Sequence, residues 1–205
     1  MSNLVLSIDL STASTGYAIF DRDAKRLEAH GKVKPKVPGI HKLKYPEATL
    51  LTIRDMTARV RDLILTVNPS RLVIEEVNRG INRIGQKGLD ACHFFLLDEI
   101  MKIRPDLIKT LTYVDSNGKK GWRGMLSLKL SDQDKQVNAE IRLRNRRKKK
   151  TQKAPLIDYK VLAQRYVNAK FKKSFNVWEN PGDNDECDAI AMGDAFITYL
   201  DKPLS

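Results

Sequence analysis

Three short runs near the N-terminal end constrain the fold of this chain more than any other feature. Residues 4–10 and 16–20 are rich in Leu, Val, Ile, Tyr and Phe, and "STAST" lies between them. A third run, 26–34, follows a short polar turn. Strands spaced so closely are typical of an antiparallel meander. The sequence therefore predicts three antiparallel strands at the start of the fold.

Helical and extended segments alternate after the meander. Residues 46–66 have apolar side chains at helical spacing behind Pro46, and "RLVIEEV" at 71–77 has the composition of a short strand. We expect a polar loop at 78–88, a helix at 89–103, a strand at 107–114, and helices at 155–170 and 184–200. The apolar stripe of the first helix consists of Leu50, Ile53, Met56, Val60, Leu63 and Ile64.

This order predicts one α/β domain over residues 1–205, with a mixed five-stranded sheet flanked by helices. Strand–helix–strand connections are right-handed and parallel, so the first strand should pair in parallel with the fourth. No apolar stretch approaches the ~20 residues that cross a bilayer, and the N-terminus is typical of a strand rather than a signal peptide. Cys92 and Cys187 have no metal-binding spacing, which favours free thiols in a reducing compartment.

Positive charge is concentrated in one segment of the chain. The formal net charge is +12, and residues 117–153 hold 13 basic side chains against three acidic ones. Such a segment favours a polyanionic partner, most often nucleic acid. We therefore expect a basic insertion at about 116–153. The alternative interpretation of its "RNRRKKKTQK" run is a flexible, solvated stretch.

Carboxylates stand where the predicted elements end. Asp9 ends the first strand, and Glu75 and Glu76 end the fourth, although the sequence does not decide which of the two points toward a site. Asp183 or Asn184 could cap the last helix, with Glu186 as the reciprocal partner of Asp183. The acids of that first turn could therefore serve only the helix dipole.

Capping does not explain Asp188. It shares one helical stripe with Asp185, Ala191, Met192 and Ala195, and a carboxylate among small apolar side chains is costly unless it is paired or binds a metal. We expect Asp9, Glu75, Asp185 and Asp188 to converge as catalytic and metal-binding residues. Carboxylate oxygens favour Mg²⁺ or Mn²⁺, and two such ions suit hydrolysis of a phosphodiester. The alternative for Asp9 alone is an acid facing solvent.

The stretches "SIDLSTASTGYAIF", "LVIEEV" and "DECDAIAMGDAF" resemble the RuvC-like Holliday junction resolvases of the RNase H-like superfamily. "IGQKG" is also similar to a region of that family. The resemblance covers about residues 4–114 and 155–200. It implies that Asp9, Glu75, Asp185 and Asp188 are the four acids of a metal-dependent endonuclease. It also implies a homodimer that nicks four-way junctions symmetrically.

Two departures from the family pattern bear on the substrate. Asn78 and Arg79 stand where some members carry an aromatic wedge, and the segment 116–153 is longer and more basic than usual. These differences suggest a phage or mobile-element relative that acts on branched DNA. Its location would then be the cytoplasm, that of a bacterial host if a phage encodes it.

The expected DNA contacts are basic or polar side chains around these segments. Trp122 could stack on a base at a branch point or be an ordinary structural tryptophan. The expected set is Asn78, Arg79, Arg83, Lys87, Lys119, Lys120, Trp122, Arg123, Arg144, Arg146, Arg147, Lys148, Lys149 and Lys150.

Three rival functions deserve comparison. An actin-like ATPase would need a duplicated domain and a second phosphate loop, so we expect no nucleotide cofactor. A ribonuclease H-type enzyme or a flap nuclease would use the same acids, and the sequence does not separate these from a junction nuclease. A binding module without catalysis would lack one of the acids, and all four are present.

Overall fold

The computed structural model describes residues 3–76 and 83–201 and contains one five-stranded mixed sheet. The strand order is β3-β2-β1-β4-β5, with β1 antiparallel to β2 and parallel to β4. This confirms the predicted sheet and the parallel pairing of the first and fourth strands. The strands are β1 (Leu4–Asp9), β2 (Thr15–Asp21), β3 (Arg26–Val33), β4 (Arg71–Glu75) and β5 (Thr112–Val114).

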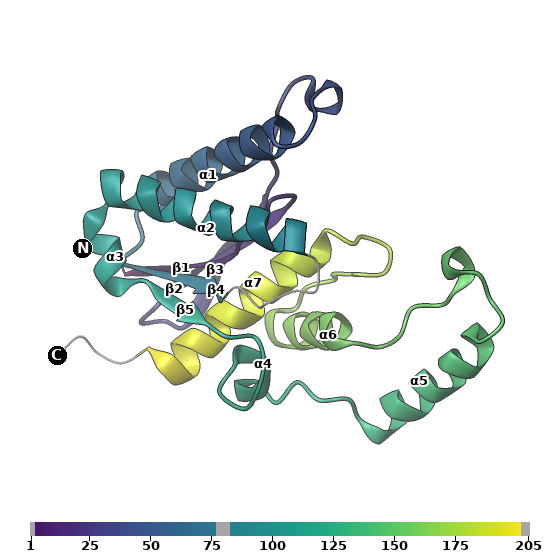
Figure 1. Cartoon of the computed structure of the whole chain (residues 1–205). Helices are drawn as coiled ribbons and strands as arrows, with labels where there is room; N and C mark the ends of the chain where they lie inside the picture. Colours follow the sequence, from purple (N-terminus) through teal and green to yellow (C-terminus); the bar gives the residue numbers. More distant parts are fainter. Residues whose placement is uncertain (1–2, 77–82, 202–205) are drawn as a thin grey trace.

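Helices cover both faces of the sheet (Figure 1). Successive side chains of a strand point to opposite faces of the sheet, so the core consists of two clusters. Leu6 and Ile8 of β1 pack toward α1 and α2, whereas Val5 packs toward α7. The helices of the first face are α1 (Glu47–Val67), α2 (Arg83–Ile103) and α3 (Pro105–Thr110), after the short η1 (Ile40–Lys42). The second face carries α4 (Trp122–Met125), α6 (Tyr159–Phe171) and α7 (Asp183–Ala195), which continues as η3 (Phe196–Leu200).

The later part of the basic segment, residues 131–152, forms an arm that projects from this body (Figure 1). Its helix α5 (Asp132–Asn145) begins with a capping box between Ser131 and Asp134, and η2 (Lys150–Gln152) follows. Asp134 also pairs with Arg165 of α6 at 2.7 Å, and the Asn138 amide group exchanges two hydrogen bonds with the Ile157 backbone. The base of the arm is therefore fixed to the body.

The first helix agrees with its predicted stripe except at one residue. Ile53, Met56, Val60 and Ile64 are buried, whereas Leu50 is 43% exposed near the start of the helix. Among the described residues, no helix combines the length and the apolar character needed to span a membrane.

Two segment predictions on the α1 face are wrong. Residues 78–82 of the loop predicted over 78–88 lie outside the described residues, and the rest is helical from Arg83. Buried Gly88 continues the stripe of Cys92, Leu96 and Ile100, which favours the helix. The strand predicted over 107–114 is a helix up to Thr110. Pro105 starts α3, and Leu107 is buried in the core, so only Thr112–Val114 joins the sheet.

The predicted cap of the last helix is also wrong. The N-cap of α7 is Gly182, which makes no side-chain cap. Asp183 accepts a hydrogen bond from the Asn176 backbone N–H instead, and Glu186 pairs with His30 at 2.8 Å and with Lys32 at 3.3 Å. These acids tie the start of α7 to its surroundings, including strand β3.

Candidate active site

Three of the predicted acids meet at one edge of the sheet. Asp9 ends β1, Glu75 ends the neighbouring β4, and Asp188 comes from the second turn of α7. Each offers a carboxylate oxygen, and these oxygens all lie within 4.8 Å of one another. The parallel pairing of β1 and β4 sets Ile8 beside Ile74, so the next residues of the two strands emerge together.

The fourth predicted acid, Asp185, lies beside this triad rather than within it. It precedes Asp188 by three residues on α7, which places both on one side of the helix. Its negative charge contributes to raising the pKa values of Asp9 and Asp188. The sequence did not decide whether Glu75 or Glu76 points toward the site. In the structure Glu75 belongs to the cluster, whereas Glu76 is exposed.

The pKa values of the triad are all raised. Burial is the largest cause for Asp9, and the charges of Asp188, Glu75 and Asp185 add to it. Burial raises the pKa of Asp188 to about 7, although the nearby Arg123 lowers it. Burial also raises the pKa of Glu75, against a hydrogen bond from the Ser116 side chain that stabilises its ionised form. Negative charge is therefore unfavourable at this edge of the sheet.

The donor set fits a hard divalent cation. All the ligand atoms are carboxylate oxygens, which Mg²⁺ and Mn²⁺ prefer. Asp188 is 4% exposed, and its Oδ1 atom is buried without a hydrogen-bond partner among the described residues. A buried carboxylate oxygen without a partner costs free energy, which a bound cation would recover.

Gly16 allows α7 to approach the sheet at this site. It is the residue of β2 opposite Asp9, and a Cβ atom built on it would lie 1.9 Å from the carbonyl oxygen of Asp185. No larger residue could occupy this position without moving the helix or the strand. The glycine of the "TGYAIF" motif thus sets the distance between the carboxylates of α7 and those of the strands.

Among the described residues, Arg123 forms an ion pair with the triad. Its Nη2 atom lies 3.5 Å from Oδ2 of Asp188, and its guanidinium lies over the rings of Trp122 and Tyr159 at 4.7 and 5.6 Å. Lys160 at the start of α6 also lowers the pKa of Asp188. The sequence contains no local signal for either contact, because each basic residue lies far from Asp188 along the chain.

The prediction that Trp122 contacts DNA is wrong. It is fully buried against α7, so its ring is closed to a DNA base, and the stacking role considered for it does not fit this structure. The structural interpretation of this residue is the one that agrees with the packing. The exposed aromatic side chain beside Arg123 is Tyr159, which is 53% exposed.

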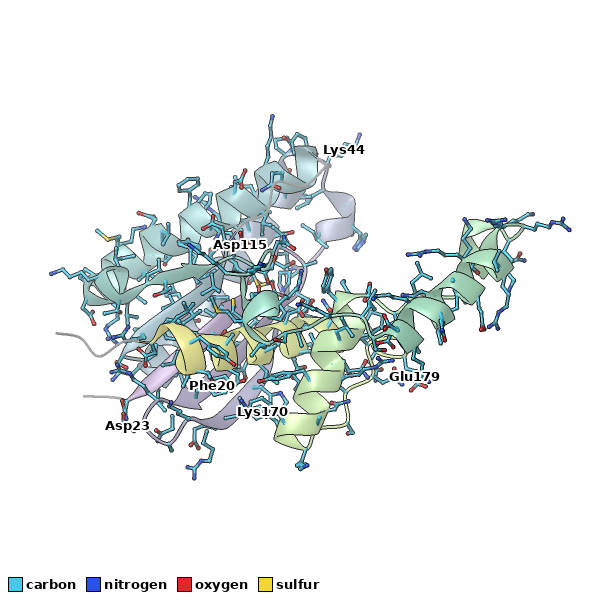
Figure 2. All side chains as sticks on the ribbon, turned by 90° about the horizontal axis from the view of Figure 1, so that it is seen from below. Phe20, Asp23, Lys44, Asp115, Lys170 and Glu179 are labelled. Atoms are coloured by element: carbon cyan, nitrogen blue, oxygen red, sulfur yellow. The ribbon has the colours of Figure 1, made fainter. Side chains whose placement is uncertain are left out.

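The other expected DNA contacts divide into three groups. Asn78 and Arg79 lie outside the described residues, as do the side chains of Arg83 and Lys150. Lys87 is exposed on α2. The remaining basic residues are exposed on the 116–121 loop and on the arm, where nitrogen-tipped side chains gather in Figure 2: Lys119, Lys120, Arg144, Arg146, Arg147, Lys148 and Lys149.

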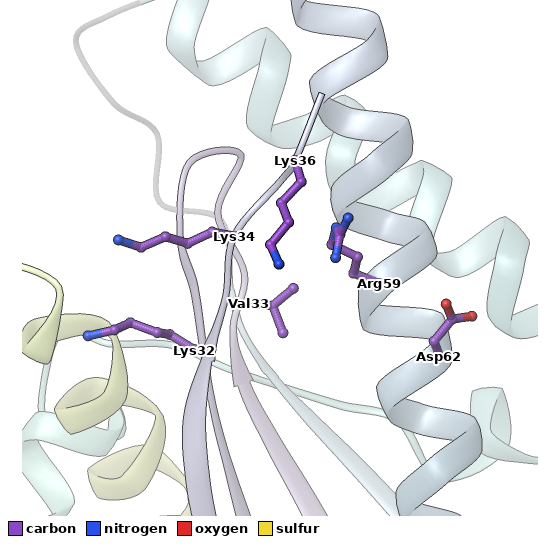
Figure 3. A pocket seen from close by; sticks show the side chains of 6 residues that line it. All are labelled: Lys32, Val33, Lys34, Lys36, Arg59 and Asp62. Carbon is purple, nitrogen blue, oxygen red and sulfur yellow. The ribbon is translucent and has the colours of Figure 1, made fainter. Parts of the chain in front are cut away.

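A second basic surface was not foreseen from the sequence. A cleft of about 540 Å³ lies between the end of β3 and helix α1. Four basic residues, Lys32, Lys34, Lys36 and Arg59, line it together with Val33 and one acid, Asp62 (Figure 3). Gly16 pairs with Asp9 on one side and Lys32 on the other, so the cleft lies at the same edge of the sheet as the acids. The alternating lysines of "KVKPK", residues 32–36, are the sequence pattern that could have indicated this basic surface.

The sheet order β3-β2-β1-β4-β5, with helices on both faces, is that of an RNase H-like fold. Among solved structures, Thermus thermophilus RuvC in complex with a Holliday junction substrate matches with a TM-score of 0.52 at 12% identity, over 97% of this chain and 94% of that one. This chain therefore has the RuvC-like fold, and the resemblance seen in the sequence is confirmed at the level of the fold.

Two further structures match less closely. The fowlpox virus resolvase with its Holliday junction DNA has a TM-score of 0.47 at 12% identity, over 97% of this chain and 99% of that one. The yeast mitochondrial Holliday junction resolvase has a TM-score of 0.49 at 13% identity, over 94% and 78%. No protein-family model and no curated protein sequence matches the chain.

Proposed function

We propose that this protein is a metal-dependent DNA endonuclease that hydrolyses phosphodiester bonds in four-way junctions and other branched DNA. The observation that carries the proposal is the meeting of Asp9, Glu75 and Asp188 within 4.8 Å in a RuvC-like fold. An acidic cluster alone is weak support. A buried, unpartnered oxygen on Asp188 and three raised pKa values make a structural role for these acids unsatisfactory.

Asp9, Glu75, Asp185 and Asp188 would hold two Mg²⁺ or Mn²⁺ ions, which supply water activation and charge stabilisation in phosphodiester hydrolysis. Other residues of the chain position these carboxylates and the substrate. Ser116 orients the Glu75 carboxylate, and Gly16 sets the approach of α7. Arg123 places a permanent positive charge at the rim of the cluster, where it can contact the scissile phosphate.

The DNA would cross the edge of the sheet between two basic surfaces. The arm and the 116–121 loop lie on one side, and the cleft of Lys32, Lys34, Lys36 and Arg59 lies on the other. Contacts of this kind bind phosphates and give affinity without sequence information. Such an enzyme would act in the cytoplasm, where DNA is accessible to it.

We further propose a homodimer, because symmetric nicking of a junction needs two active sites. Helix α2 offers a face for it. Phe94 and Met101 are 71% and 54% exposed, and partly buried Leu97 lies between them on one helical stripe. Large apolar side chains grouped on a solvent-facing helix are typical of a protein–protein interface.

A ribonuclease H-type or flap nuclease would use the same acids, so substrate comparison is the deciding experiment. Labelled four-way junction, duplex, flap and RNA–DNA hybrid are incubated with Mg²⁺ and the wild type, Asp9→Asn or Asp23→Asn. Asp23 is exposed in the β2–β3 turn and serves as the matched control. Paired nicks in the junction that only Asp9→Asn abolishes would support the proposal. Cutting of the RNA–DNA hybrid alone would show that the substrate is a hybrid and not a junction. Full activity of Asp9→Asn would refute the proposed catalytic role of the acidic cluster.

A further inference from the structure

A cavity of about 500 Å³ opens beside the carboxylates, between the 116–121 loop, helix α4 and the start of α6. This volume lies within the range of sites that hold small organic groups. The proposed metal chemistry uses two of its lining residues, Ser116 and Arg123, but assigns no occupant to the cavity itself. Its principal lining residues are Ser116, Asn117, Lys119, Arg123, Lys129 and Tyr159.

The cavity and the acidic cluster share two residues. Ser116 lines the cavity and also donates a hydrogen bond to Glu75. Arg123 lines it too, and its guanidinium lies 3.5 Å from Asp188. A group that fills the cavity therefore lies next to whatever is bound at the carboxylates. A phosphate undergoing hydrolysis there would have its neighbouring nucleotide within reach of the cavity.

The lining combines an aromatic face with positive charge. Tyr159 is 53% exposed, and its ring lies 5.6 Å from the Arg123 guanidinium. Lys119 and Lys129 are exposed, and neither forms an ion pair within the described part of the chain. An aromatic ring offers a stacking surface to any base, and unpaired lysines attract phosphate. This is the chemistry that recognises a nucleotide.

Close backbone packing preforms the wall of the cavity. A Cβ atom on Gly124 would lie 2.2 Å from the carbonyl oxygen of Gly118, and one on Gly121 would lie 2.3 Å from that of Asn117. The Trp122 backbone N–H also donates to the carbonyl of Asp115 at 2.8 Å. The loop is held against α4, so the cavity does not need to be built on binding.

We propose that this cavity holds one nucleotide of the DNA strand adjacent to the scissile phosphate, with its base stacked on Tyr159 and its phosphate near Lys119 and Lys129. The proposal rests on the proposed nuclease function and deepens it. It makes Tyr159 a residue that selects the position at which the strand is cut.

The test measures how far cutting depends on a base at each position. The nicks in a four-way junction are mapped first. Abasic sites are then placed one at a time at the three nucleotides on either side of a nick, and single-turnover rates are compared with those of the intact junction. The proteins are the wild type, Tyr159→Ala, Tyr159→Phe, and Tyr199→Ala as control. Tyr199 is 56% exposed in η3, at the opposite end of the sheet.

For the wild type we expect one position at which removal of the base slows cutting about 5- to 100-fold, the range of a single stacking contact. Tyr159→Ala should cut the intact and abasic junctions at equal rates, whereas Tyr159→Phe and Tyr199→Ala should keep the difference. If Tyr159 only supports Arg123, Tyr159→Ala will slow every junction equally and the base dependence will persist, which overturns the inference. Base dependence absent from the wild type also overturns it. Absence of all cutting would refute the nuclease function itself.

Discussion

Replacement of Gly16 by alanine is the most direct test of how the carboxylates of the candidate active site are brought together. The added Cβ would lie 1.9 Å from the carbonyl oxygen of Asp185, and carbon and oxygen atoms of this kind do not approach closer than 3.0 Å. The first turn of α7 and strand β2 must therefore separate by about 1 Å. Asp188 lies one turn further along α7 and would move with it, away from Asp9 and Glu75.

The size of the effect follows from this displacement. A misplacement of about 1 Å in a catalytic arrangement costs on the order of 100-fold in rate. Overpacking costs about 1–3 kcal/mol, and the lower entropy of the unfolded chain with alanine recovers roughly 0.5–1 kcal/mol of it. We therefore expect about 1–2 kcal/mol of destabilisation, which corresponds to a fall of roughly 3–6 °C in Tm for a chain of this size.

The assay is single-turnover cutting of a four-way junction at saturating protein and a series of Mg²⁺ concentrations. Gly16→Ala should cut about 100-fold more slowly and need more Mg²⁺, while its affinity for the junction stays near that of the wild type because the basic arm is unaltered. Gly88→Ala is the control for stability, since the nearest atom to its Cβ lies 3.8 Å away, so Tm should rise slightly. Cutting by Gly16→Ala at the wild-type rate and with the wild-type Mg²⁺ dependence would refute the reasoning.

Three further predictions concern charge and assembly. In EDTA the free energy of unfolding should fall between about pH 4 and pH 7. The pKa of Asp188 is about 7 in the folded protein, against an ordinary aspartate value of 3.8, so the folded state binds more protons in that window. Asp188→Asn should accordingly raise Tm in EDTA at pH 8, because it removes one buried negative charge from the cluster. An unchanged Tm would contradict the view that repulsion between these carboxylates destabilises the fold. Replacement of residues 146–149 by serine should lower the slope of log K against log salt by up to about 3–4, in filter-binding titrations with the junction; an unchanged slope would mean that these residues do not touch DNA. Phe94→Lys should convert the proposed dimer to a monomer in light scattering, and a dimer that persists would place the interface elsewhere.

The fold was predictable where a signal was local and strong. The alternating apolar strands and the long stripe of α1 predicted the antiparallel meander and the parallel pairing of β1 with β4, and the structure confirms both. The errors fall where tertiary packing overrides local preference. Gly88 looked like a loop residue, yet it is buried on the stripe of α2 that faces α1. The β-branched residues around Leu107 looked like a strand, although burial of that leucine favours a helix.

The carboxylates were predictable because each stands at the end or on the apolar side of its own element. The groups around them were not. Arg123 reaches Asp188 across 65 residues of chain, and the buried position of Trp122 depends on α7, which comes much later in the sequence. Tyr159 becomes part of a cavity only when α6 is placed against α4. Contacts between segments that are distant in the sequence leave no local sequence pattern. Composition therefore identified the basic segment but not the residues in it that face the acidic cluster.

The distribution of charge implies that binding and cutting are separable. Residues 117–153 carry most of the excess positive charge, but the arm, with its exposed lysines and arginines, projects away from the sheet and its helices (Figure 1). At the site, Arg123 and Lys160 oppose four carboxylates, and the pKa values of three of those remain raised. A phosphate would be repelled from such a cluster until divalent cations neutralise it. The arm should therefore hold DNA without divalent cations, whereas placement of the scissile phosphate should require them.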